Sequence, residues 1–238
     1  MDEIDYFCDM DWRNLPGLAV APLCAVCGAP LVGGERWLCT ACLGALPREH
    51  PDDGPYGPLR ERLAVRGLDV RHVVCWTVYV HDSAPGALIR RGKYGGRPQI
   101  FAELAAAMGG DVARRCADAR PDVLLPVPMH WRKRLLRGYN QAAILARGLG
   151  RAMDVPVGDN LRAVKAHSTQ TRRSADDRAR GGEGVFAVAH AEELRGLHVG
   201  VVDDILTTGG TLTAALEALR AAGVEAASVF TLAVTPRR

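Results

Sequence analysis

The stretch VGVVDDILTTGGTLTAALEAL, residues 199–219, places an apolar run, two adjacent carboxylates, a Thr/Gly-rich turn and a helix-forming sequence in that order. The valines of the run predict a buried strand that delivers Asp203 and Asp204 to the sheet edge where α/β folds bind ligands. The helix is expected to begin near Thr211, and its N-terminus adds a partial positive charge to the backbone N–H groups of the turn. The stretch therefore predicts an anion-binding loop with two carboxylates beside it.

The chemistry of this loop points to a sugar phosphate. Its turn, ILTTGGT, carries three threonines and two glycines. Like charges repel, so the neighbouring carboxylates would not serve the phosphate itself, and they suit ribose hydroxyls or a hydrated magnesium ion. The alternative is ordinary turn and capping chemistry, in which Asp ends a strand and Thr-Gly precedes a helix. The order of residues fits neither the Walker A pattern nor Gly-x-Gly-x-x-Gly.

The overall composition is that of a mildly basic globular protein. The 238 residues are 48% hydrophobic and carry a formal net charge of +3, which suits phosphorylated small molecules and nucleic acid equally. The sequence has no apolar run of about 18 residues, so membrane insertion is not expected. It starts with MDEID, which is acidic where a signal peptide is basic, and we expect a cytoplasmic protein.

Four of the seven cysteines form two Cys-x2-Cys pairs, Cys24 with Cys27 and Cys39 with Cys42. Each pair places two sulfurs on one side of a tight bend, so four thiolates can converge on a tetrahedral Zn²⁺ ion. Because all four ligands are sulfur, the site is expected to be structural rather than catalytic. The alternative, four unrelated buried or reactive cysteines, is disfavoured by the pairing within one short segment.

The pattern along the chain predicts a small module followed by an α/β domain. Residues 1–50 hold the paired cysteines, residues 51–69 are rich in Pro, Gly and charge and are expected to form a connection, and residues 70–238 form the domain. Strands are expected at 71–80, 122–128, 155–164 and both ends of 198–234, and helices at 85–96, 98–116, 139–153 and after Thr211. This alternation is typical of a mainly parallel sheet flanked by helices.

Several of these stretches also carry a resemblance to a known family. VVDDILTTGGT is similar to the phosphoribosyl pyrophosphate (PRPP) motif of type I phosphoribosyltransferases, and the four-cysteine module ahead of it resembles the competence protein F (ComF) family. RGKYGGRPQIFAELA, DVLLPVPMHWRKRLLRGYNQAAILARGL and, more loosely, TQTRRSADDRARGGEGVF are similar to three further segments of that family. The resemblance runs from about residue 15 to 235, and Arg173 and Gly181 depart from the last segment.

The resemblance implies a type I phosphoribosyltransferase fold after a zinc module, with PRPP and Mg²⁺ as ligands. Asp203 and Asp204 would contact ribose hydroxyls directly or through Mg²⁺, and the 5′-phosphate would be wrapped by Thr207, Thr208, Gly209, Gly210 and Thr211. The implied pyrophosphate site lies in the turn after the LLPVP strand and comprises Val127, Pro128, Arg132, Lys133, Arg134 and also Lys93. The polar segment 165–184 would be a flap over the site, containing Gln170, Ser174 and Arg178.

Two classes of function remain open from the sequence. In the first, the protein transfers phosphoribosyl from PRPP to a nitrogen acceptor. In the second, it binds PRPP or single-stranded DNA without turnover and acts in DNA uptake with other competence proteins, as the family's link to natural competence implies. HWRKRLLRGYN, residues 130–140, has four cations and no acid, and Trp131 and Tyr139 would either stack on bases or pack locally. The paired carboxylates favour the first class, since DNA binding gains nothing from them, and the altered flap favours the second.

Overall fold

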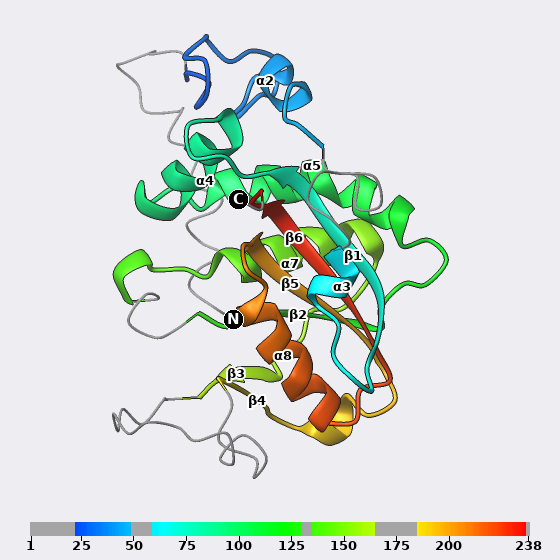
Figure 1. The fold of residues 1–238 in the computed structure, drawn as a ribbon. Helices are drawn as coiled ribbons and strands as arrows, with labels where there is room; N and C mark the ends of the chain where they lie inside the picture. The colour runs from blue at the N-terminus through cyan, green and yellow to red at the C-terminus, as the bar shows by residue number, and fades with distance from the viewer. Residues whose placement is uncertain (1–21, 49–58, 130–134, 165–184, 237–238) are drawn as a thin grey trace.

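The main sheet is parallel throughout. The computed structural model describes residues 22–48, 59–129, 135–164 and 185–236. The four strands of the sheet lie in the order β1 (Asp69–Val78), β6 (Ala226–Val234), β5 (His198–Leu206) and β2 (Val123–Pro126). Every neighbouring pair runs in the same direction, so the carboxyl ends of all four strands lie at one edge of the sheet (Figure 1). The predicted α/β class is confirmed.

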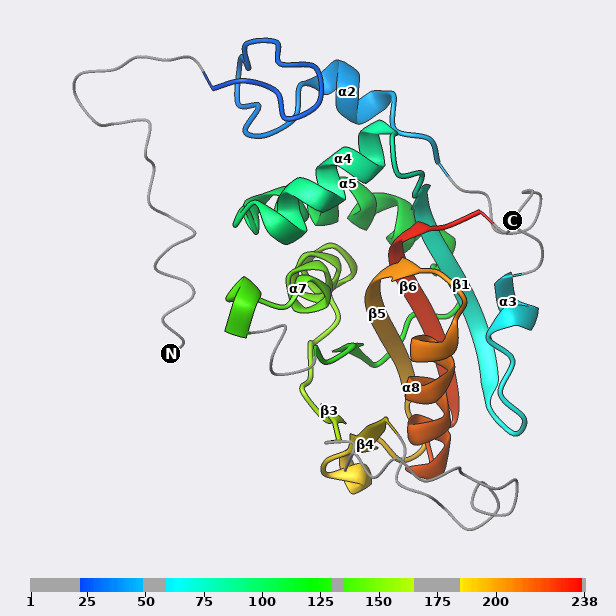
Figure 2. The ribbon, with the colours of Figure 1, turned by 60° about the vertical axis from the view of Figure 1, so that its left-hand side comes forward.

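Helices cover both faces of this sheet (Figure 2). One face carries α4 (Ala84–Tyr94), α5 (Gln99–Arg115) and α7 (Gln141–Met153), and the other carries α8 (Gly210–Ala221). The helices expected at 85–96, 98–116 and 139–153 agree with these bounds to within two residues. Among the described residues, no helix combines the length and the apolar character that a membrane crossing requires.

The alternation of side chains along β5 divides the core into two clusters. Val201 belongs to the buried cluster on the side of α8, whereas Val202 belongs to the cluster on the side of α7. Successive residues of a strand face opposite sides of a sheet. The same alternation therefore directs Asp203 toward the side of α8 and Asp204 toward the side of α4 and α7.

Small residues allow α5 and α7 to lie close together. A Cβ atom added to Gly148 would lie 2.4 Å from the Cβ of Ala105, and one added to Gly109 would lie 2.5 Å from that of Ala152. These distances leave no room for a side chain at either glycine. The two helices therefore form a tight layer, and α7 in turn contacts β5 and β2.

The segment expected as a strand at 155–164 differs from that expectation. Its only strand is β3 (Leu161–Ala163), which pairs antiparallel with β4 (Phe186–Val188), a strand that the sequence pattern did not predict. The residues before β3 still follow the edge of β2, since Leu124 N donates to Pro156 O at 2.8 Å and Gly158 N donates to Leu124 O at 2.9 Å. Pro156 has no N–H group to donate, which prevents a continuous ladder at this edge.

Two short elements precede the main sheet, and a third follows β4. Residues 22–48 contain the helix α2 (Thr40–Gly44), and the expected connection contains the helix α3 (Leu59–Arg62). Leu63, directly after α3, is fully buried in the cluster on the side of α8. A 3-10 turn, η3 (Ala191–Glu193), leads from β4 towards β5. Part of the segment expected as a connection thus packs against the domain.

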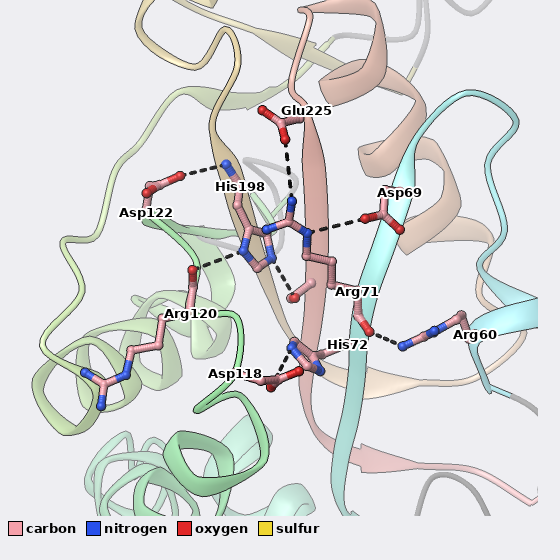
Figure 3. A network of polar contacts seen from close by, with 10 residues as sticks. Arg60, Asp69, Arg71, His72, Asp118, Arg120, Asp122, His198 and Glu225 are labelled. Carbon is pink, nitrogen blue, oxygen red and sulfur yellow. Dashed lines mark hydrogen bonds and ion pairs between the residues drawn. The ribbon is translucent and has the colours of Figure 1, made fainter.

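A polar network around His198 lies at the amino ends of the strands, opposite the carboxyl edge (Figure 3). The buried His198 ring has its Nδ1 3.1 Å from the Arg120 carbonyl oxygen and its Nε2 2.8 Å from Ser228 Oγ. These contacts fit a neutral ring that donates from Nδ1 and accepts at Nε2. The His198 backbone N–H also donates to Asp122 Oδ2 at 2.8 Å. Burial lowers the pKa of His198, and the positive charge of Arg71 lowers it further.

The lowered pKa of His198 predicts a loss of stability in mild acid. Below about pH 6.5 the unfolded chain takes up a proton that the folded ring resists, so the contribution of His198 to the free energy of unfolding is full above that pH and falls as the pH drops. The variant His198→Asn, whose amide can still donate to the Arg120 carbonyl, should show a shallower fall between about pH 7 and pH 5. Urea unfolding at several pH values measures this slope, and equal slopes in both proteins would exclude His198 as its cause.

Candidate functional site

Asp203 and Asp204 lie in the last part of β5, where the neighbouring strand β2 has already ended. The register of β2 with β5 ends at the pair Pro126 and Val202, so both carboxylates follow the last paired residue. On the other side of β5, β6 continues alongside as far as Leu206. Ligands of open α/β sheets bind outside the carboxyl ends of the strands. The two carboxylates thus stand at the edge where a ligand site is expected.

An ion pair joins Asp204 to α4. The Lys93 ammonium nitrogen lies 2.7 Å from Asp204 Oδ2, and the two side chains are only 15% and 17% exposed. Lys93 lies in the last turn of α4, where a cation suits the helix dipole. Ser83 precedes the helix as its N-cap, and its Oγ accepts from Gly86 N at 3.3 Å. Lys93, which the family resemblance grouped with the pyrophosphate residues, therefore contacts one of the two carboxylates.

Asp203 has a different environment from Asp204. Burial raises the pKa of Asp203 to about 7, and the adjacent Asp204 carboxylate contributes to this rise. The backbone N–H of Asp204 donates to Asp203 Oδ1 at 2.8 Å. Hard carboxylate oxygens of this kind fit Mg²⁺, which takes most of its other ligands from water and substrate phosphates. A cation close to Asp203 would favour its ionised form.

The loop after β5 leads directly into α8. Gly209 is buried, has a φ of +93° and stands at the N-cap of α8, a backbone conformation that favours glycine. The first turn of the helix is closed by Thr213 N donating to Gly209 O at 2.8 Å. The other four predicted phosphate ligands are exposed: Thr207, Thr208, Gly210 and Thr211. A helix N-terminus without a side-chain cap, surrounded by exposed hydroxyls, suits a phosphate group.

The turn after β2 is tied to the start of α7. Val127 is buried, its N–H donates to Val202 O at 2.8 Å, and its carbonyl oxygen accepts from Asn140 Nδ2 at 3.0 Å. Asn140 also caps α7, since its Oδ1 accepts from Ala142 N at 3.1 Å. Pro128 follows and is partly exposed. The other predicted residues of the turn and the flap lie outside the described residues: Arg132, Lys133, Arg134, Gln170, Ser174 and Arg178.

Tyr139 and Asn140, directly before α7, connect this part of the chain to α4 and to the turn after β2, and the buried Gln141 follows them. Tyr139, for which base stacking and local packing were both considered above, is partly buried, and its hydroxyl donates to the Gly92 carbonyl on α4. Asn140 was not singled out from the sequence, although Asn before an apolar helical run is a helix-start signal. Gln141 is 1% exposed, and neither of its side-chain amide atoms has a hydrogen-bond partner among the described residues. No local pattern in the sequence signals the contact of Tyr139 with Gly92 or that of Asn140 with Val127.

The four paired cysteines come together in the N-terminal module. The sulfurs of Cys24, Cys27, Cys39 and Cys42 all lie within 4.8 Å of one another, and those of Cys27 and Cys39 are 3.8 Å apart. Tetrahedral zinc with Zn–S bonds of about 2.3 Å places its sulfurs about 3.8 Å apart. The cluster could therefore hold one metal ion, and its all-sulfur donor set suits zinc.

Backbone N–H groups point at the sulfurs of this cluster. Cys24 Sγ accepts from Val26 N at 3.5 Å and from Cys39 N at 3.4 Å, and Cys39 Sγ accepts from Cys42 N at 3.4 Å. Burial opposes ionisation of Cys24, but backbone N–H groups, that of Cys27 foremost, lower its pKa to about 6. Burial and the neighbouring thiols raise the pKa of Cys42 to about 12. A bound divalent cation is what would stabilise all four as thiolates.

The N-terminal module that contains the four paired cysteines, here called the thiol module, lies against α4 and α5 (Figure 1). Its apolar residues belong to the same buried cluster as those of the two helices. Trp37 N donates to Glu103 Oε2 on α5 at 3.0 Å, and Arg91 on α4 donates to the carbonyl of Ala25, which lies between the first two cysteines. Arg91 precedes Lys93 by two residues, so α4 contacts the thiol module and the carboxylates within a single turn.

Residues 98–238 match the family described as phosphoribosyl transferase domain. Competence protein F of Haemophilus influenzae is 38% identical over 115 residues, which cover 48% of this chain and half of that protein. The DNA utilization protein YhgH of Salmonella typhimurium is 30% identical over 245 residues, which cover 92% of this chain and 99% of that protein. The chain belongs to the competence protein F family.

The phosphoribosyl transferase domain of this competence protein F family member accounts for part of the site. The chain has the type I phosphoribosyltransferase fold, and the matched region contains β2, β5 and α8 and hence both carboxylates and the loop. The match begins after α4, so Lys93 and the four thiols lie outside it. Among solved structures, the glutamine PRPP amidotransferase from B. subtilis has a TM-score of 0.45 at 21% identity, over 60% of this chain and 30% of that chain.

Proposed function

We propose that this competence protein F family member binds PRPP with Mg²⁺ and transfers the phosphoribosyl group to a nitrogen acceptor. The observation that carries the proposal is the arrangement of β5 and α8, in which two carboxylates are followed by a Thr/Gly loop and a helix N-terminus without a side-chain cap. A sugar phosphate needs both kinds of group, because its hydroxyls donate to carboxylates and its phosphate accepts from N–H groups. The phosphoribosyl transferase domain match supports the same ligand class.

In this reaction the bond from ribose C1 to pyrophosphate breaks and a bond from C1 to nitrogen forms, through a transition state with oxocarbenium character. Asp203 and Asp204 would hold the ribose hydroxyls, and the exposed groups of the loop would bind the 5′-phosphate. When bound, Mg²⁺ offsets the charge on the leaving pyrophosphate. The N–H of Val127 already donates to Val202 O, so any backbone donors that this turn offers to pyrophosphate would come from residues after Val127.

A second function, binding of PRPP or single-stranded DNA without turnover, is favoured by exposed side chains at the C-terminal end of α4 and in residues 135–137. Tyr94, Leu135 and Leu136 are 74%, 79% and 87% exposed, and the Arg137 guanidinium carbon lies 5.0 Å from the centre of the Tyr94 ring. Exposed aromatic rings beside cations are the groups that bind single strands. The relatives named for competence and DNA utilization support a role in DNA uptake.

Calorimetric titration combined with pyrophosphate release separates these two functions. The transferase predicts PRPP binding that requires Mg²⁺, and pyrophosphate release with a member of a panel of bases, amines and ammonia. Ribose 5-phosphate and pyrophosphate, added separately as controls, should each bind more weakly than PRPP. PRPP binding without release across the panel, together with salt-sensitive binding of an oligothymidylate, would favour the second function. Absence of any PRPP binding with Mg²⁺ would contradict the transferase.

We also propose that one structural Zn²⁺ ion organises the module of residues 1–50, ahead of a connection at 51–69 and a transferase domain at 70–238. The convergence of four sulfurs and their N–H contacts support this assignment. Reduced thiols are maintained in the cytoplasm, which is where we expect the protein to act.

A further inference from the structure

We propose that Lys93 controls access of a divalent cation to Asp204. Its ammonium holds the carboxylate in an ion pair, and releases it when the pyrophosphate of the substrate offers the ammonium another anion. The identity of that anion rests on the proposed function, whereas the exclusion of a free metal ion does not. The consequence is that metal binding and PRPP binding depend on each other.

The ion pair and a metal ion compete for the same carboxylate. Lys93 Nζ lies 2.7 Å from Asp204 Oδ2, whereas Mg²⁺ binds oxygen at about 2.1 Å and requires a nearly octahedral shell of further oxygen ligands around itself. An ammonium in contact with the carboxylate occupies part of the space that those further ligands need. The ammonium and the metal ion would also be close neighbours, and two neighbouring cations repel each other. Because both side chains are largely covered, water screens this repulsion poorly. A metal ion that binds Asp204 through Oδ2 must therefore displace Lys93, and one that binds through Oδ1 is opposed by the charge of the ammonium.

Displacement of Lys93 requires a new partner for its ammonium. The end of α4 is held in place on two sides, since the Tyr139 hydroxyl donates to the Gly92 carbonyl and Arg91 donates to the Ala25 carbonyl. Only the flexible lysine side chain is then free to move, and a partly buried ammonium without a counter-ion is unfavourable. A free metal ion supplies no such counter-ion. A metal ion that arrives with pyrophosphate brings such a counter-ion, and the lysine side chain can turn to the pyrophosphate.

Lys93 differs from the neighbouring cations of α4 in the group that its side chain binds. Arg90 donates to the His81 carbonyl and Arg91 to the Ala25 carbonyl, so their guanidinium groups bind backbone oxygens. Among the described residues, Lys93 is the α4 cation that forms an ion pair with the carboxylates of β5. Arg90→Met therefore removes one positive charge from the same helix without touching the ion pair, and serves as the matched control for Lys93→Met.

The test measures metal and substrate binding separately in protein loaded with zinc. Mn²⁺, which replaces Mg²⁺ and is followed by electron paramagnetic resonance, should bind Lys93→Met about 10-fold or more tightly than wild type in the absence of substrate. Calorimetry should show that the same variant binds PRPP with Mg²⁺ about 10-fold more weakly, because a charge-assisted contact is lost. Arg90→Met should stay near wild type in both measurements. A purely structural role of Lys93 would not change the two affinities in opposite directions.

The outcomes distinguish this inference from the proposed function. If wild type binds PRPP with Mg²⁺ but Mn²⁺ affinity is equal in wild type and Lys93→Met, the inference fails and the proposed function stands. If Mn²⁺ affinity rises in Lys93→Met but wild type binds no PRPP, the exclusion of free metal stands and the proposed function fails. Adding Asp204→Asn to Lys93→Met should abolish the gain in Mn²⁺ affinity, and a gain that persists would overturn the inference. Lys93→Gln replaces Lys93→Met if the latter does not fold.

Discussion

Replacing Asp203 and Asp204 together by Asn should weaken the binding of PRPP in the presence of Mg²⁺ by about 100-fold or more. Each carboxylate would lose a charge-assisted contact worth about 1.5–3 kcal/mol, which corresponds to roughly one order of magnitude in Kd for each residue. Asn keeps the size of the side chain and part of its hydrogen bonding. The loss of affinity therefore reports on the two negative charges rather than on the shape of the site.

The same double variant should stay folded, because its two substitutions act on stability in opposite directions. Burial raises the pKa of Asp203 to about 7, so the folded state disfavours its ionised form, and stability is lost as the pH rises towards that value. Asn at this position removes that loss at and above neutral pH. Asn at position 204 instead leaves the Lys93 ammonium without its carboxylate, which is destabilising. We expect a small net change in Tm.

The measurement is titration calorimetry with PRPP and Mg²⁺, accompanied by a melting curve. The matched control replaces Asp82 and Asp159 by Asn, since these side chains are 90% and 84% exposed and their loss changes the net charge by the same amount. That control should bind PRPP as wild type does. Wild-type affinity in the Asp203/Asp204 variant, with a normal melting curve, would reduce the pair to a feature of the strand end and remove the main support for the transferase.

The parts of the site that could be predicted from sequence are those that are contiguous along the chain. The buried strand β5, its two carboxylates and the glycine-containing start of α8 follow one another within 21 residues, and each leaves a local signal: an apolar run, a turn composition and a helical period. The strands of the main sheet agree with the expected ranges to within two residues for the same reason, because buried strands are continuously apolar.

The contacts that complete the site could not be predicted in this way, because they join distant parts of the chain. The partner of Lys93 is set by how α4 packs on β5, and the bond from Tyr139 to Gly92 depends on the approach of α7 to α4. The strand β4 was missed because it has three residues, too few to show a period of two. The raised pKa of Asp203 likewise results from burial in the folded state, to which the sequence alone gives no access.

Loss of the four-thiolate site should cause a second large effect, the unfolding of residues 22–48. Within that range the one helix, α2, has five residues, which is too short to be stable by itself. Structural zinc contributes apparent binding free energies on the order of 10 kcal/mol, and that energy is folding energy for the segment that supplies the ligands. The double variant Cys27→Ser, Cys39→Ser should therefore lose the expected content of about one zinc per chain and the hydrogen-exchange protection of this segment.

The effect of zinc loss should also reach α4, because the module and this helix share one buried cluster and the bond from Arg91 to the Ala25 carbonyl. Protection of α4 should fall in the double variant, whereas β5, β6 and α8 should keep theirs, since the two strands are hydrogen-bonded on both sides within the sheet and Leu216 of α8 lies in the other cluster. Hydrogen exchange read by mass spectrometry resolves these segments.

The control is Cys116→Ala, which removes a buried thiol outside the four-sulfur cluster and should retain full zinc content. Purified wild-type protein without zinc after growth in zinc-replete medium would contradict the metal assignment. Unchanged protection of α4 after zinc loss would show instead that Lys93 is held in place without the module.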